Sequence, residues 1–327
     1  MSRITIRRAL SQLENEGLLR RIAGRGSFVT RPETHPKSLN HGAIGMILPD
    51  FSESYGLELV TGVERACREA GIPLFLSRSE TSVEFESRAI ERLLSVGCSG
   101  LILMPQQRAY YNADVVRLIL DDFPVVILDR KLTGIQAPCI SSDNESIVYH
   151  MTMKLLELGH RDIALVSNPI HSATTLSERY QGFIRAFREH KILWNDSLLY
   201  DGLLDAREDV DLAERIMIDR EGIKRFIQDH PKITCIFVTE YHLSQMVLLV
   251  CEDLGLKIPE DISIVGYDGP RSITGNYILT RILQPQEEMG TEAVKILQRM
   301  IAGEDFEMPK PFPSRILEGR SLTIPRV

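Results

Sequence analysis

Short apolar runs alternate with amphipathic stretches along the chain beyond residue 42. The runs have the length of buried strands, as in Ala43–Leu48 and Cys235–Val238, and helical spacing of apolar residues follows most of them. Buried strands joined by helices predict parallel sheets that are covered on both faces. About 285 residues are too many for one such sheet, so we expect two lobes with a ligand site between them.

The spacing defines the individual elements. Strands are expected at 43–48, 73–77, 100–104, 124–128, 162–166, 198–201, 235–238 and 262–267. Helices are expected over 56–70, 84–96, 112–121, 146–158, 177–189, 219–229 and 242–254, and several of them end at a glycine.

The first 31 residues have a different pattern. Ser2 is placed to cap a helix, Ile6, Leu10 and Leu13 share one of its faces, and Gly17 ends it. Residues 18–22 and 28–29 are apolar or basic and enclose a glycine-rich turn, which predicts a small hairpin. Residues 30–42 hold two prolines and show no period, so they form a linker.

The basic side chains of this head are arranged on two surfaces. Arg3 and Arg7 are four residues apart and project together from the helix, with Thr5 beside them. Arg25 occupies the tip of the expected hairpin. Guanidinium groups on the first turns of a helix can reach base edges or phosphates in a major groove, so the pattern favours DNA as the partner.

Charge separates the head from the body. The 327 residues are 43% hydrophobic and 25% charged, which is typical of a globular protein, and they carry a net charge of −7. Residues 1–31 hold seven arginines against two glutamates, a surplus of +5, so the remainder carries −12. A basic head on an acidic body indicates that the head meets a polyanion, although chance clustering on a solvated helix face is the alternative.

Several classes of protein are disfavoured by what the sequence lacks. No apolar run approaches the length of a membrane span, and the N-terminus has no secretion signal. Five scattered cysteines form no metal-binding pair, which predicts free thiols in a cytoplasmic protein. The nucleophile, phosphate-loop, dinucleotide and zinc-hydrolase motifs are absent, so we expect no enzyme, no cofactor and no metal.

Three strings in the head resemble the second half of a GntR-type winged helix-turn-helix. They are Ser-Arg-Ile-Thr-Ile-Arg-Arg-Ala-Leu over 2–10, Leu-Glu-Asn-Glu-Gly-Leu-Leu over 13–19 and Gly-Arg-Gly-Ser-Phe-Val over 24–29. The resemblance implies that the helix from Ser2 is the recognition helix and that the hairpin tip touches the minor groove or the backbone. The implied DNA contacts are Ser2, Arg3, Thr5, Arg7 and Arg25.

A complete domain of that type has further helices before the recognition helix. We expect that these helices are encoded upstream of Met1. Either a GTG valine codon has been taken as the start codon, or the chain is a fragment. A genuine truncation, which leaves a crippled DNA binder, is the alternative.

The body is similar to the effector domain of the lactose-repressor and periplasmic sugar-binding superfamily. The resemblance implies a two-lobed α/β fold of two parallel, doubly wound sheets over 42–327, after a partial winged helix-turn-helix over 1–31 and a linker over 32–41. It places lobe 1 at about 42–159 and 286–305 and lobe 2 at about 161–284 and 315–327. The matching strings, in family order, are 62–66, 100–105, 124–130, 142–144, 158–166, 178–183, 258–268 and 284–290.

Position in the matching strings implies an effector site. In such folds ligands bind at the carboxyl ends of strands, where carboxylates and guanidiniums pair with sugar hydroxyls and an aromatic ring covers the apolar face. One departure occurs where the family has an Asn-Asp pair and this chain has Glu240-Tyr241-His242, which suggests a carboxylate moved by one position or a different ligand. His160, at a helix end, is expected to serve structure. The expected effector-binding residues are Phe51, Tyr55, Arg130, Arg179, Glu240, Asp268 and Gln284.

Together these observations predict a cytoplasmic, homodimeric transcription factor that represses carbohydrate-utilisation genes. Two heads would bind a pseudo-palindromic operator, and a small carbohydrate effector would release them. The alternative function is a sugar-binding protein that has lost DNA binding, and an enzyme that uses the interlobe site is a more distant one.

Overall fold

The computed structural model of the protein describes residues 19–22, 26–29, 42–80, 82–106, 111–203, 211–270 and 278–326. The expected strands and helices beyond residue 42 are present, although α7 begins at Leu212 rather than at 219. In chain order the elements are β1 Leu19–Ile22, β2 Gly26–Val29, β3 Ala43–Leu48, α2 Leu57–Glu69, β4 Leu74–Arg78, α3 Val83–Ser95, β5 Cys98–Leu103, α4 Ala113–Leu120, β6 Val125–Leu128, β7 Cys139–Ile140, α5 Asn144–Glu157, β8 Ile163–Val166, α6 Thr174–Glu189, the 3₁₀ turn η1 Asp196–Leu198, β9 Leu199–Tyr200, α7 Leu212–Asp229, β10 Cys235–Val238, α8 Tyr241–Asp253, β11 Ser263–Tyr267, β12 Thr280–Leu283, α9 Gln286–Ala302 and β13 Arg315–Leu317.

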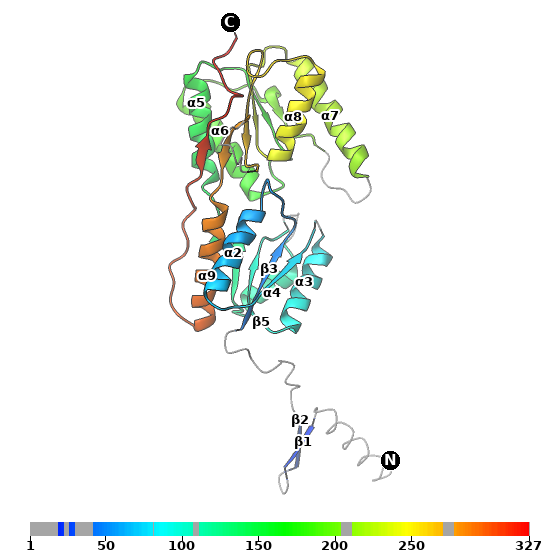
Figure 1. Cartoon of the computed structure of the whole chain (residues 1–327), viewed down its shortest axis with the longest axis vertical. Helices are drawn as coiled ribbons and strands as arrows, with labels where there is room; N and C mark the ends of the chain where they lie inside the picture. Colours follow the sequence, from blue (N-terminus) through cyan, green and yellow to red (C-terminus); the bar gives the residue numbers. More distant parts are fainter. Residues whose placement is uncertain are drawn as a thin grey trace.

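Two sheets define two lobes, which are stacked end to end in Figure 1. Lobe 1 contains the parallel sheet β4-β3-β5-β6-β7; α2 and α9 share one apolar core with it, and α3 and α4 share the other. Lobe 2 contains β9-β8-β10-β11-β12, also parallel, with β13 added antiparallel at its edge. The α5–α6 pair and the α7–α8 pair lie on opposite sides of that sheet (Figure 1). The expected fold of two doubly wound parallel sheets is confirmed.

Both parallel sheets have the same strand order, in which the first strand lies between the second and the third. In each lobe, two helices also pack very closely against each other at a glycine. A side chain at Gly290 of α9 would meet the backbone of Leu59 in α2, and one at Gly182 of α6 would meet the backbone of Glu145 in α5. The lobes therefore repeat one architecture, and each brings the carboxyl ends of its strands to an equivalent edge.

The first passage between the lobes lies earlier than expected. Helix α5 contributes Val148, Met151 and Leu155 to the core of lobe 2, where it packs against α6. The chain therefore leaves lobe 1 between β7 and α5 rather than at 159–161. It returns between β12 and α9 and leaves again after Phe312, which bridges to Ser142 before β13 joins lobe 2.

The predicted hairpin in the head is present within the described part of the chain. Strands β1 and β2 pair antiparallel, with Leu19 opposite Val29 and Ile22 opposite Gly26. The expected DNA contacts, Ser2, Arg3, Thr5, Arg7 and Arg25, lie outside the described residues.

His160 is fully buried and joins three separate segments of lobe 2. Its Nε2 lies 2.8 Å from the carbonyl oxygen of Thr323, which can only accept, so Nε2 carries the proton. Its Nδ1 therefore accepts from the Thr234 hydroxyl at 2.8 Å. Burial lowers the pKa of His160, which favours this neutral form. The structure thus gives His160 the structural role that its position predicted.

Two further properties follow from the described residues. All five cysteines are free thiols. Within the described ranges, no helix has the length and apolar character that crossing a membrane requires.

The close packing of α2 against α9 gives a test of the fold. Helix propensity alone predicts that Gly290→Ala stabilises the protein by about 1 kcal/mol. The added methyl group would lie 2.4 Å from the Leu59 carbonyl oxygen, so we expect a net loss of about 1–3 kcal/mol in the free energy of unfolding. Urea denaturation measures this. Gly202→Ala, where the added group meets nothing within 4 Å, is the control, and equal stabilities for both variants would contradict the packing.

Candidate functional site

Two aspartates occupy equivalent places in the two lobes. Asp129 follows β6 and Asp268 follows β11, and both are buried. Their φ angles are 62° and 58°, a left-handed conformation that residues other than glycine seldom adopt. The N–H group of Asp129 donates to Ile140 and that of Asp268 to Ile282, each at 2.7 Å. The backbone is thus bent in the same way at both strand ends, which aims the two carboxylates at the junction between the lobes.

The Arg179 guanidinium lies between these carboxylates. It comes from α6, is buried, and stacks 3.6 Å above the ring of Tyr267. Its Nε donates to Asn144 Oδ1 at 3.0 Å and its Nη1 to the Thr239 carbonyl at 2.6 Å. Burial opposes its charge, yet the surrounding negative groups, which include both aspartates, raise its pKa overall.

Asp268 is held by Gln284. The side-chain amide of Gln284 donates to Asp268 Oδ2 at 2.7 Å, and its own Oε1 accepts from the Ser142 hydroxyl. Burial raises the pKa of Asp268 to about 7, and this rise is limited by Arg179 and by the Gln284 hydrogen bond. Gln284 therefore orients a carboxylate at this site, in addition to the effector contact expected of it.

Tyr55 and Asp129 carry two polar atoms that lack partners. Tyr55 Oη and Asp129 Oδ1 are buried, and neither makes a hydrogen bond of good geometry with a described residue, although the two side chains lie near enough to interact with each other. Burial and the neighbouring Asp129 raise the pKa of Tyr55, and burial also raises the pKa of Asp129 against the attraction of Arg179. Buried polar groups are nearly always hydrogen-bonded, so two such atoms together indicate a place where a ligand binds. We call Tyr55, Asp129, Arg179, Asp268 and Gln284 the interlobe cluster.

The remaining expected residues lie around this cluster. Phe51 is half-buried and packs on the core of lobe 1. Arg130 is half-buried and donates to the Pro105 carbonyl at 3.3 Å. Glu240 precedes α8, accepts from the Asn168 amide and lies within electrostatic reach of Arg179.

Direct contacts hold the lobes together next to the cluster. Lys131 of lobe 1 forms an ion pair with Glu178 of lobe 2 at 2.7 Å. The Gly269 N–H of lobe 2 donates to the Ser54 carbonyl of lobe 1 at 3.1 Å. The interlobe cluster is therefore assembled from both lobes. Two surface cavities of about 210 Å³ each are lined by other residues.

The structure adds residues that the sequence analysis did not select. Asp129 is not among the expected effector-binding residues, although its place beside Arg130 in the matching string over 124–130 is a usable signal. Asn144, Glu178 and Tyr267 also lie in matching strings. Asn144 Oδ1 accepts from both Arg179 and Tyr267, and Asn144 Nδ2 donates to Glu178 at 3.1 Å. No group of histidine, cysteine or acidic side chains within the described part of the chain could hold a metal ion.

Comparison with known proteins gives consistent matches. Residues 152–322 match the periplasmic binding protein-like domain family. The arabinose metabolism transcriptional repressor of Geobacillus stearothermophilus is 31% identical over 308 residues, which cover 92% of this chain and 81% of the relative. The solved structure of the transcription regulator CcpA of Lactococcus lactis has a TM-score of 0.72 at 23% identity, and that of a LacI family transcriptional regulator from Enterococcus faecium with bound ribose has 0.68 at 24%. These structures cover 86% and 87% of this chain and 99% and 100% of their own.

The fold defines a two-lobed protein of the periplasmic binding protein-like class. The chain belongs to the family of DNA-binding transcriptional regulators that carry a periplasmic binding protein-like domain. One similar solved structure is titled a LacI family regulator, and the comparisons do not show the GntR-type head that the sequence suggested.

The raised pKa of Asp268 predicts a specific dependence of stability on pH. A folded-state pKa of about 7, above the unfolded value of 3.8, means that the folded protein holds a proton that the unfolded chain releases. This contribution to stability is complete below pH 3.8 and is lost as the pH rises through 7. The side chain of Asp268→Asn stays neutral, so this variant does not lose that contribution. Between roughly pH 4 and 7, the free energy of unfolding of the unsubstituted protein should therefore fall relative to that of the variant by up to about 1.4 kcal/mol per pH unit.

Denaturation curves at several pH values in this range measure that difference. Asp305→Asn, which replaces an exposed carboxylate, is the control. A difference between Asp268→Asn and the unsubstituted protein that does not vary with pH would place the titration elsewhere.

Proposed function

We propose that this regulator represses carbohydrate-utilisation genes and leaves its operator when a small neutral sugar binds at the interlobe cluster. The observation that carries the proposal is the pair of unpartnered atoms, Tyr55 Oη and Asp129 Oδ1, beside the buried Asp268 and Arg179. Adjacent hydroxyls of a sugar can donate to both carboxylates and accept from the guanidinium and the phenol.

Charge favours a neutral ligand over an anionic one. Two guanidiniums, on Arg130 and Arg179, face three carboxyl groups, on Asp129, Asp268 and Glu240, and burial raises the pKa of the two aspartates, so the site has no surplus of positive charge to attract a phosphate or carboxylate. The names of the relatives are in agreement, because one is an arabinose metabolism repressor and another was solved with ribose.

We infer that the head binds DNA through Ser2, Arg3, Thr5, Arg7 and Arg25. Support comes from its charge of +5 on a chain of −7 and from the transcriptional role of the relatives. A homodimer would present two heads to a two-fold symmetric operator, which one small head could not bind with specific affinity. The two lobes can adopt two arrangements, and one of them separates the heads. The effector controls DNA binding only if its affinity for that arrangement is higher than its affinity for the other.

The effector site predicts a loss of ligand response in one variant. Thermal unfolding of the full chain is followed with a panel of neutral pentoses and hexoses that includes L-arabinose and D-ribose. At least one sugar should raise the melting temperature, and Asp268→Ala should abolish that rise because a buried hydrogen-bond acceptor is lost. Asp305→Ala should preserve it. A rise that Asp268→Ala leaves unchanged would remove this residue from the site.

The head predicts a separate loss of DNA binding. Arg7→Ala should weaken binding to promoter fragments next to the gene by roughly tenfold or more, because a charge-assisted contact is removed. The response to sugar should stay intact. Fluorescence anisotropy over a series of salt concentrations measures both the affinity and its salt dependence.

Arg68→Ala, on α2 of lobe 1, serves as the charge-matched control. Loss of sugar response together with DNA binding in Arg7→Ala would contradict the separation of head and body, and an affinity independent of salt would contradict phosphate contacts by the head.

A further inference from the structure

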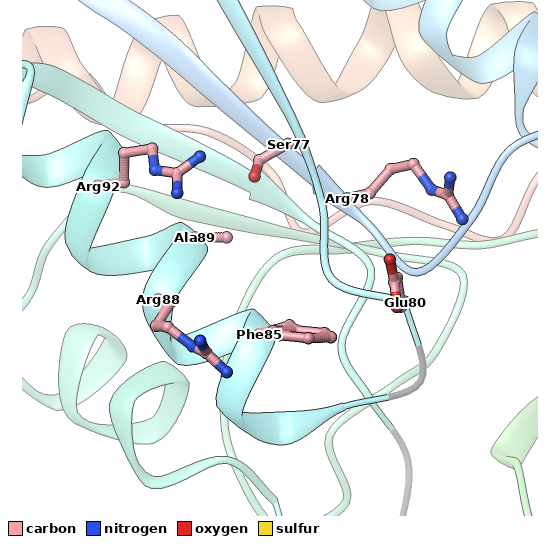
Figure 2. Close-up of a pocket in the computed structure, with 7 residues that line it drawn as sticks. All are labelled: Ser77, Arg78, Glu80, Phe85, Arg88, Ala89 and Arg92. Atoms are coloured by element: carbon pink, nitrogen blue, oxygen red, sulfur yellow. The ribbon is translucent and has the colours of Figure 1, made fainter. Parts of the chain in front are cut away.

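A cavity on the surface of lobe 1 is lined by charged side chains that do not belong to the proposed sugar site. It has a volume of about 210 Å³ and lies between the end of β4 and the first turns of α3. Figure 2 shows its walls, with the side chains of α3 on one side and those of β4 and the following loop on the other. None of its lining residues belongs to the interlobe cluster. Those that matter are Ser77, Arg78, Glu80, Phe85, Arg88 and Arg92.

Two of the three arginines in this cavity have no acidic partner among the described residues. Arg78 forms an ion pair with Asp50 at 3.2 Å. Arg88 has only a 3.3 Å hydrogen bond to the Glu84 carbonyl and a contact of its guanidinium with the Phe85 ring, 4.6 Å from the centroid. For Arg92 no ion pair occurs within the described part of the chain. Two positive charges are therefore available at the cavity, and one carboxylate, on Glu80, lines it.

The arrangement on α3 differs from that on the other helices. Arg68, Arg117 and Arg225 each pair with an acidic residue four positions away on the same helix. Arg92 instead has Arg88 at that distance, and Arg88, which has Glu84 four positions before it, bonds the Glu84 carbonyl rather than its carboxylate. Like charges at this spacing destabilise a helix, and an anion bound between them reverses the sign of the interaction.

The cavity walls suit a small phosphate group in particular. Two guanidiniums one helical turn apart can each donate two hydrogen bonds to phosphate oxygens. The Ser77 hydroxyl lines the opposite wall as a further donor, and the Phe85 ring offers an apolar surface to a sugar ring. The volume lies below the several hundred Å³ of pockets for larger organic ligands, which favours a compact ligand.

We propose that this α3–β4 cavity binds a small phosphate-bearing molecule, either inorganic phosphate or a phosphorylated sugar. It is a second site, distinct in charge from the interlobe cluster: lobe 1 binds an anion at its surface, whereas the junction of the lobes receives a neutral polyol. Through the Arg78–Asp50 ion pair the cavity is connected to the loop after β3, which also carries Tyr55 of the interlobe cluster.

Isothermal titration calorimetry on the full chain tests the proposal. Inorganic phosphate and glucose 6-phosphate are titrated separately, with sodium chloride at matched ionic strength as the blank. We expect saturable binding of at least one of the two phosphates. Arg88→Gln together with Arg92→Gln should weaken it at least tenfold, because both charge-assisted contacts are lost. These side chains are exposed, so the variant should fold, which its melting temperature verifies.

Two controls locate the site. Arg68→Gln with Arg117→Gln removes the same charge from two other helices of lobe 1, and Asp268→Asn alters the interlobe cluster; both variants should bind phosphate as the unsubstituted protein does. A tighter affinity for glucose 6-phosphate that falls to the level of phosphate in Phe85→Leu identifies a phosphorylated sugar. Equal affinities identify the free anion. No saturable binding, or equal affinity in the Arg88/Arg92 variant, overturns the proposal.

Discussion

The interlobe cluster depends on a single buried cation. A guanidinium is costly to bury unless charges and hydrogen bonds compensate it, and Arg179 receives that compensation from both halves of the molecule. Asn144, Thr239 and the Tyr267 ring fix it within lobe 2, and Asp129 approaches it from lobe 1. Any change in the distance between the lobes therefore changes the balance of charge around Arg179. A ligand that binds there is in a position to decide which lobe arrangement is stable.

The repeated architecture explains why the cluster forms where it does. Both sheets have the same strand order, and in each lobe an aspartate with positive φ follows the fourth strand of that order. These strands are β6, which precedes Asp129, and β11, which precedes Asp268. Two equivalent edges thus present equivalent carboxylates to each other, with Arg179 between them. The neutral-ligand preference proposed above is a consequence of this duplication, because two acids share one deeply buried cation.

Much of this arrangement could be predicted from the sequence, since apolar runs mark buried strands well. Arg179 and Asp268 were also predicted, because they sit in strings shared with a known superfamily. Periodicity shows that a helix has an apolar face but not which sheet that face covers, so α5 was assigned to lobe 1 although Met151 lies in the core of lobe 2. The short strands β7 and β13 carry too few residues for a pattern. The role of Asp129 depends on an unpaired buried oxygen, which only three-dimensional packing reveals.

We propose that a small neutral sugar binds between the lobes and is held by Arg179 with the two aspartates. The most direct measurement is a crystal structure of the full chain with the sugar that stabilises it most against heat. We expect sugar hydroxyls within hydrogen-bond distance of Asp129, Arg179 and Asp268, with Tyr55 Oη also bonded to the ligand. A sugar bound elsewhere, with these four side chains arranged as they are without it, would contradict the account.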